Sequence, residues 1–209
     1  MKKLITISIL TFVLTSFTTD KVSFVGKILY KYSFSDLKGN DITEKLVPYL
    51  GREQHYFIDN LNYKAYNEKG SWTQLYNSET NSYYYFNKDN TAKKYDGATQ
   101  TSQKFIVTKL DKKENIAGYD CEAIQVDTDN ATTIYYFNKS IKTNTINFSK
   151  HNFGEWNKYL EATDGALSLK FIMTDHKNGY VWTSVASEAS KQNLTSADFV
   201  LPTDIKLKN

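Results

Sequence analysis

Apolar and polar residues alternate along most of this chain, a pattern typical of β-strands with one buried face. The clearest N-terminal example begins at Phe24, where lysines and serines occupy the alternate positions. This alternation predicts a long strand that packs one face against a core. The residues on that face are Phe24, Gly26, Ile28, Tyr30, Tyr32 and Phe34.

A second strong pattern lies near the C-terminal end, where two alternating runs flank Asn178-Gly179. Asn-Gly between such runs favours a two-residue β-hairpin turn. With that turn, Lys177 pairs with Tyr180. The same register predicts the pairs Asp175 with Trp182, Met173 with Ser184 and Phe171 with Ala186.

Short alternating runs separated by polar turn residues fill the rest of the chain and predict about ten strands. Residues 35–49 indicate a loop with one helical turn, and residues 152–164 fit either a short helix or an ordered loop. Helical patterns long enough for parallel crossovers are absent. The predicted fold class is therefore mainly β, with a minor helical part: a curved antiparallel sheet or unclosed β-barrel with one or a few short helices.

The first residues have the pattern of a secretory signal peptide. Lys2-Lys3 precedes an apolar run from Leu4 to Leu14, and small residues follow near residues 16–19. This run is shorter than the roughly 20 residues of a transmembrane helix. We expect a signal peptide over residues 1–19 and a single β-rich domain over residues 20–209, so that the mature protein is soluble and either periplasmic or secreted.

Charge and cysteine content restrict the partners. The formal net charge is +3, and Lys2 and Lys3 within the predicted signal carry two of these charges. Basic and acidic residues are interspersed and Arg52 is the only arginine, which argues against a nucleic-acid partner. The single cysteine, Cys121, excludes an internal disulfide and does not follow the apolar run where a lipid anchor would need it.

Motifs for catalysis and for metal binding are absent from the sequence, so we expect no enzyme activity, no catalytic residues, no metal site and no cofactor. The three histidines, His55, His151 and His176, lack metal-ligand spacing, and we interpret them as surface or capping residues. Cys121 lies in an alternating strand between Asp120 and Glu122, which disfavour a thiolate. We interpret it as a small buried side chain.

Aromatic residues make up 15% of the chain and have two interpretations. They can line a pocket for a lipid or other apolar ligand, or they can pack a β core with their hydroxyl groups at its rim. In the second case the protein is an interaction or scaffold domain of the cell envelope, with an envelope protein as its partner. For the first case the candidate ligand-binding residues are Tyr30, Tyr32, Phe34, Phe171, Met173 and Trp182.

Four segments together resemble a family of secreted bacterial proteins of the Bacteroidota type, related to the outer-membrane lipoprotein carrier fold. These are Gly26 to Tyr30, Tyr56 to Asp59 with Tyr63-Lys64, Ile116 to Cys121, and Leu194 to Pro202. The resemblance implies a lipoprotein-carrier-like sheet wrapped over a few helical pieces, with an apolar cavity on its concave side. The chain departs from the carrier in its single arginine and its long polar turns, so lipid carriage is an analogy of fold.

Overall fold

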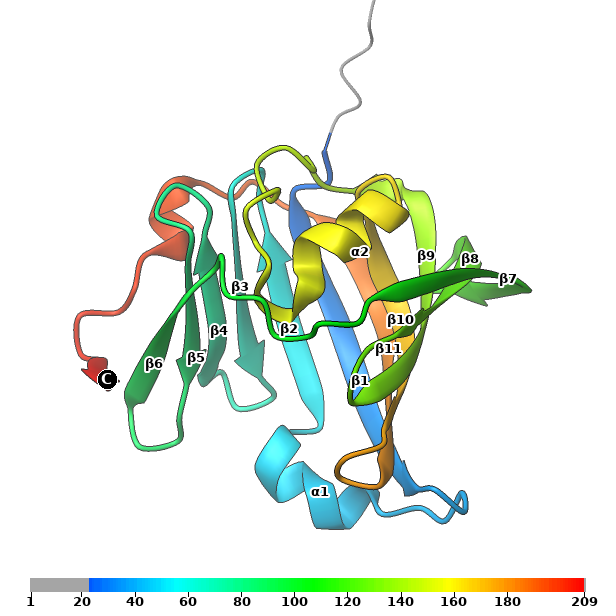
Figure 1. Ribbon diagram of the computed structural model, residues 1–209. Coiled ribbons are helices and arrows are strands. Elements are labelled where there is room, and N and C mark those ends of the chain that lie inside the picture. The colour runs from blue at the N-terminus through cyan, green and yellow to red at the C-terminus, as the bar shows by residue number, and fades with distance from the viewer. Residues whose placement is uncertain (1–22, 209) are drawn as a thin grey trace, which may run out of the picture.

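Twelve strands form one curved, unclosed sheet in the computed structural model, which describes residues 23–208 (Figure 1). The predicted fold class is confirmed, with twelve strands among the described residues instead of about ten. The predicted signal peptide, residues 1–19, lies outside the described residues and stays a prediction. The strands are β1 (Gly26–Asp36), β2 (Glu53–Ile58), β3 (Asn62–Asn67), β4 (Trp72–Asn77), β5 (Ser82–Phe86), β6 (Thr91–Asp96), β7 (Ile106–Ile116), β8 (Tyr119–Asp127), β9 (Ala131–Lys142), β10 (Ala166–Asp175), β11 (Tyr180–Lys191) and β12 (Lys206–Lys208).

The strand order places the first strand, β1, beside β11, which comes late in the chain. It reads β12-β6-β5-β4-β3-β2-β1-β11-β10-β9-β8-β7, so β1 lies between β2 and β11 near the centre. All neighbours are antiparallel except β12, which runs parallel to β6. The helical pieces are α1 (Thr43–Leu50), α2 (Trp156–Ala162) and two short 3-10 turns at Phe153–Glu155 and Ser196–Phe199. Residues 152–164 thus contain the short helix that the sequence left open.

The hairpin between β10 and β11 is present, but its predicted register is wrong by two residues. Asp175 pairs with Tyr180, so the connection has four residues, 176–179, instead of two. The Asp175 carboxylate accepts hydrogen bonds from the Asn178 backbone N–H at 2.8 Å and from its side-chain amide at 2.7 Å. These bonds stabilise the wider turn. A shift of two residues preserves the faces, so the predicted buried strip is unchanged.

A row of one isoleucine and four tyrosine side chains crosses the upper half of the concave face. Strand register aligns Ile58 with Tyr63, Tyr63 with Tyr76, Tyr76 with Tyr83, and Tyr83 with Tyr95. We call these five residues the tyrosine row. Residues 143–165, here the covering segment, include α2, which lies in front of the sheet in Figure 1. Their packing fills this half of the concave face.

His151 of the covering segment stacks directly on the tyrosine row. Its ring lies parallel to that of Tyr76, with centroids 3.9 Å apart, and its Nε2 is 2.8 Å from the Tyr63 hydroxyl. The side chain is 0% exposed, so the prediction of a surface or capping histidine is wrong for this residue. Burial lowers the pKa of His151 to about 3, against a weaker opposing effect of the Gly97 backbone. The imidazole is therefore neutral at physiological pH.

The connection between β6 and β7 also holds the covering segment in place. The connection from β6 to β7 runs across the sheet below α2 (Figure 1). Buried Glu155 accepts hydrogen bonds from the Thr101 N–H at 3.1 Å, the Thr101 hydroxyl at 3.0 Å and the Ser102 N–H at 2.6 Å. These bonds satisfy a carboxylate whose burial without partners would cost free energy. They also hold the covering segment to the β6–β7 connection.

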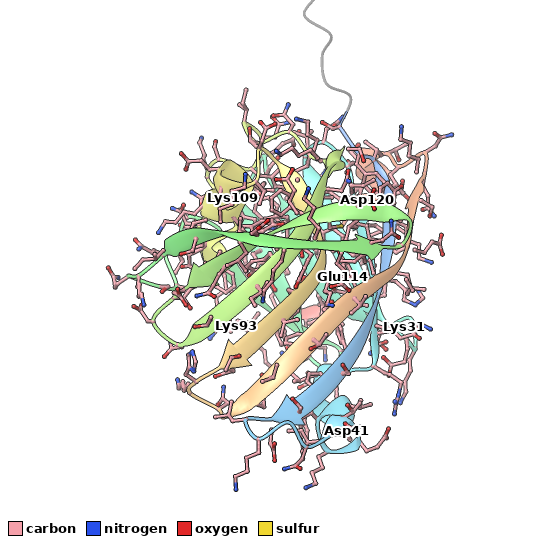
Figure 2. All side chains as sticks on the ribbon, turned by 90° about the vertical axis from the view of Figure 1, so that its right-hand side faces the viewer. Lys31, Asp41, Lys93, Lys109, Glu114 and Asp120 are labelled. Atoms are coloured by element: carbon pink, nitrogen blue, oxygen red, sulfur yellow. The ribbon has the colours of Figure 1, made fainter. Side chains whose placement is uncertain are left out.

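The β7–β8 hairpin covers part of the opposite, convex face. Figure 2 shows it crossing the outer side of β9, β10 and β11, with Glu114 near its turn. The Glu114 carboxylate lies 2.8 Å from the Lys170 ammonium of β10. A second, smaller apolar cluster on the convex side includes Leu75, Phe86, Ala92 and Phe199, and it holds the C-terminal segment. The sheet is therefore covered on both faces, but only over part of each.

The buried imidazole predicts a specific loss of stability in mild acid. Unfolded His151 takes up a proton near pH 6.5 and folded His151 only near pH 3, so acidification favours the unfolded state. Between pH 7 and pH 5 the free energy of unfolding should fall by about 2 kcal/mol from this group. Urea unfolding of the wild type and of His151→Gln at both pH values measures the effect. Equal pH dependence in the two proteins would contradict the buried neutral imidazole.

Candidate ligand-binding groove

Below the tyrosine row, the concave face changes from apolar to polar. The next row of paired positions runs from Tyr56 through Ala65 and Gln74 to Tyr85. One step lower, Gln54 of β2 pairs with Asn67 of β3. The strands therefore present amide side chains on the part of the concave face below the row that the covering segment packs against.

A groove of about 990 Å³ lies on this lower half and reaches Phe86 and Ile205 of the convex cluster at its outer end. Helix α1 makes one wall, and the lower ends of β1 to β5 make the floor. The turns after β3 and β5 form the rim. The lining residues are Tyr32, residues 47–51, Glu53, Gln54, residues 67–74, residues 85–88, Asn90, Trp182 and Ile205.

Hydrogen bonds near both ends of helix α1 hold it to the rest of the structure. The Thr43 hydroxyl accepts a hydrogen bond from the Phe34 N–H at 3.0 Å, and Glu44 binds the guanidinium of Arg52 through both carboxylate oxygens at 2.9 Å. At the far end, Lys88 from the β5–β6 turn donates to the carbonyl of Pro48. No residue of α1 is fully buried. The helix therefore spans one side of the groove without filling it.

An aromatic cluster lies on β1, β10 and β11, beside the strands that carry the amides. The Trp182 ring lies 5.0 Å from Tyr32, 5.7 Å from Phe34 and 5.3 Å from Phe171 between ring centroids. The Trp182 Nε1 is buried, and among the described residues it has no hydrogen-bond acceptor. Burial raises the pKa of Tyr32 far above its usual value, so that its hydroxyl stays protonated.

Two of the six predicted ligand-binding residues, Tyr32 and Trp182, line the groove. Tyr30 is 9% exposed and donates its hydroxyl to the Ser168 carbonyl at 2.6 Å. Phe34 is 2% exposed beneath Trp182. Both are thus part of the packed interior next to the groove.

The remaining two, Phe171 and Met173, lie on the same face of the neighbouring strand. Phe171 and Met173 are partly exposed and lie outside the groove lining, and Met173 pairs with Trp182. The structure therefore brings all six residues to one continuous face of β1, β10 and β11. Their role in binding stays a prediction.

The sequence interpretation missed the groove residues of β2, β4 and β5, namely Gln54, Gln74 and Tyr85. Alternation already places Gln54 in phase with Tyr56, and Gln74 in phase with Tyr76. Alternation does not predict how far along each strand the covering segment extends. That boundary comes from tertiary packing.

Other chemistry is sparse in the described residues. No group of three or more histidine, cysteine or acidic side chains in residues 23–208 is arranged to hold a metal ion. In the same part of the chain, every helix is too short or too polar to cross a membrane.

Cys121 is a buried side chain on β8, as predicted, with 1% of its surface exposed. Its thiol donates to the Tyr119 carbonyl at 3.4 Å. Burial first, then the charges of Glu114 and Asp120, raise the pKa of the thiol to about 11. A hollow of about 460 Å³ lies beside it at the β7 bulge, but the thiol is too covered and too weakly acidic to serve as a nucleophile there.

This environment predicts that Cys121 is inert in the folded protein. At pH 8, Ellman's reagent should label the unfolded chain in 6 M guanidinium within seconds and the native chain at least about a hundredfold more slowly, because a pKa near 11 leaves little thiolate. Absorbance at 412 nm records both reactions. Rapid stoichiometric labelling of the native protein would contradict this burial.

The fold and groove define a curved β-sheet protein with one half of its concave face covered and the other half open. No family model matches the chain, and no curated protein matches it. Among solved structures, PNGF-II matches with a TM-score of 0.50 and 14% identity over 88% of this chain. This chain spans 31% of the PNGF-II chain, so the match shows a shared fold for that part alone.

Two further structures match with lower scores. A conserved protein from Thermus thermophilus has a TM-score of 0.46 at 10% identity, over 90% of this chain and 91% of its own. A LolA-superfamily protein from Nitrosomonas europaea has a TM-score of 0.37 at 9% identity, over 86% and 91%. These weak structural similarities carry no functional information. The resemblance to the secreted Bacteroidota-type family stays a prediction.

Proposed function

We propose that this protein binds an apolar or lipid-like ligand in the groove on the lower half of its concave face. One observation carries the proposal: the upper half of this face is filled by the covering segment, whereas the lower half is open over about 990 Å³. That volume lies at the upper end of the range for small-molecule sites.

Partly exposed aromatic rings in the groove support an apolar contact surface. Tyr85 is 46% exposed although it lies on the concave face, and the partly buried Trp182 and Tyr32 also line the groove. Large apolar side chains that remain exposed inside a concave site gain free energy when a ligand removes them from water.

The groove has a wall that can move without disrupting the core. Helix α1 has no fully buried residue, and its C-terminal end contacts the β5–β6 turn through Lys88, whose ammonium lies 6.0 Å from the Tyr49 ring centroid. Such exposed contacts contribute little stability. We infer that ligand enters between α1 and this turn.

A second candidate function is an envelope interaction domain that binds another protein and no small ligand. Its support is the free edge of the sheet, where Ile106 and Val107 of β7 are 51% and 41% exposed. Lys109, Lys112 and Lys113 on the same strand oppose edge pairing, as charged edge residues generally do. The groove is therefore the stronger candidate site.

We further propose that the protein acts outside the cytoplasm, in the periplasm or after secretion. The support is the basic and apolar pattern of residues 1–19. A lipid or another apolar ligand would need shielding from water in either place.

Replacement of Tyr85 by alanine tests the groove. Nile red, a neutral apolar fluorophore, should bind the wild type with an increase in fluorescence. Tyr85→Ala should bind it about fivefold more weakly, because one aromatic contact contributes about 1 kcal/mol.

The matched control is Tyr84→Ala, because Tyr84 precedes Tyr85 on β5 and packs in the convex cluster. Its Nile red affinity should equal that of the wild type. No saturable binding, or an equal loss in both variants, would contradict the proposal.

A further inference from the structure

The groove lining contains five carboxamide side chains, and they fall into two groups. Three lie in turns and bond within them: the Asn67 oxygen accepts from the N–H groups of Lys69 and Ser71, Asn87 donates to Thr91, and Asn90 donates to Asp204. The other two, Gln54 and Gln74, lie on the sheet floor. Within residues 23–208 these two have no hydrogen-bond partner, so only the floor amides are available to a ligand.

The free amides are placed on one surface. Gln54 on β2 and Gln74 on β4 flank β3, because their paired positions on β3 are Asn67 and Ala65. Two strand spacings and an offset of two residues along β3 put their backbones about 12 Å apart. Each amide offers donors and an acceptor, so together they can bind a head group that both donates and accepts.

The charged side chains that line the groove have a formal net charge of zero. The four charged lining residues are Glu53, Glu68, Lys69 and Lys88, two of each sign. Lys88 already donates to Pro48. The only arginine, Arg52, lies outside the lining and is held by Glu44 through two hydrogen bonds. The groove therefore lacks the fork of cationic donors that recognises carboxylate or phosphate.

We propose that the ligand is a neutral amphiphile with a hydroxyl-rich head group, such as an acylglycerol or an alkyl glycoside. This inference rests on the proposed function. The head group bonds to Gln54 and Gln74 on the floor, and the apolar chain lies against Tyr32 and Trp182.

A chain-matched pair of probes separates head-group chemistry from apolar contact. 1-(9,10-Dibromostearoyl)glycerol and 9,10-dibromostearate share a chain whose bromines quench tryptophan, and Trp72 and Trp182 line the groove. At pH 8 and below micelle formation, the glycerol ester should bind at least about tenfold more tightly than the carboxylate. Equal affinity, or tighter binding of the carboxylate, would overturn the proposal.

The double variant Gln54→Leu/Gln74→Leu tests the residues. Its affinity for the glycerol ester should fall about tenfold, while Nile red binding stays within about twofold of the wild type. Gln103→Leu, at an exposed position outside the groove lining, is the control and should keep the preference. A double variant that keeps the preference would refute the role of the amides.

Nile red binding distinguishes a failure of the head-group proposal from a failure of the groove proposal. If Nile red binds and the glycerol ester shows no preference, the head-group proposal fails and the groove proposal stands. If neither Nile red nor either lipid binds, both proposals fail.

Discussion

The packing of the covering segment on the tyrosine row determines the rest of this structure. Twelve strands make a sheet too wide to bury its concave face by curvature alone. Residues 143–165 fill the upper half, and His151 is bonded to Tyr63 and stacked on Tyr76 at their centre. Burial raises the pKa of Tyr63 and lowers that of His151, so both rings stay neutral and their hydrogen bond persists across the physiological range.

The lower half of the concave face follows from this division. Where the covering segment ends, the strands change from tyrosines to Gln54, Gln74 and the exposed ring of Tyr85. A filled core would make buried amides without partners costly, whereas an open groove leaves them to solvent or to a ligand. The concave face is therefore apolar where the covering segment packs on it and more polar where it is open. One face thus serves both as a core and as a candidate site.

The sequence predicted the parts of the fold that depend on local pattern. Alternation placed Tyr30, Tyr32 and Phe34 on one face, and the Asn178-Gly179 signal located the last hairpin. The register of that hairpin differed because the Asp175 side chain caps a four-residue turn, whereas the Asn-Gly pair taken alone favours a two-residue turn. His151 and Gln54 were missed for the same reason: their environments are created by segments about 90 residues away in the chain, the Tyr63 ring for one and the boundary of the covering segment for the other.

The central claim is that the open half of the concave face is a ligand site and the covered half is not. Native mass spectrometry of the protein purified from its own host without detergent tests this most directly. The expected spectrum contains the protein with one bound amphiphile, which increasing collision energy removes, and Tyr85→Ala should show less of this complex than Tyr84→Ala. A wild-type spectrum with the ligand-free mass alone, also after incubation with excess acylglycerol, would contradict the claim.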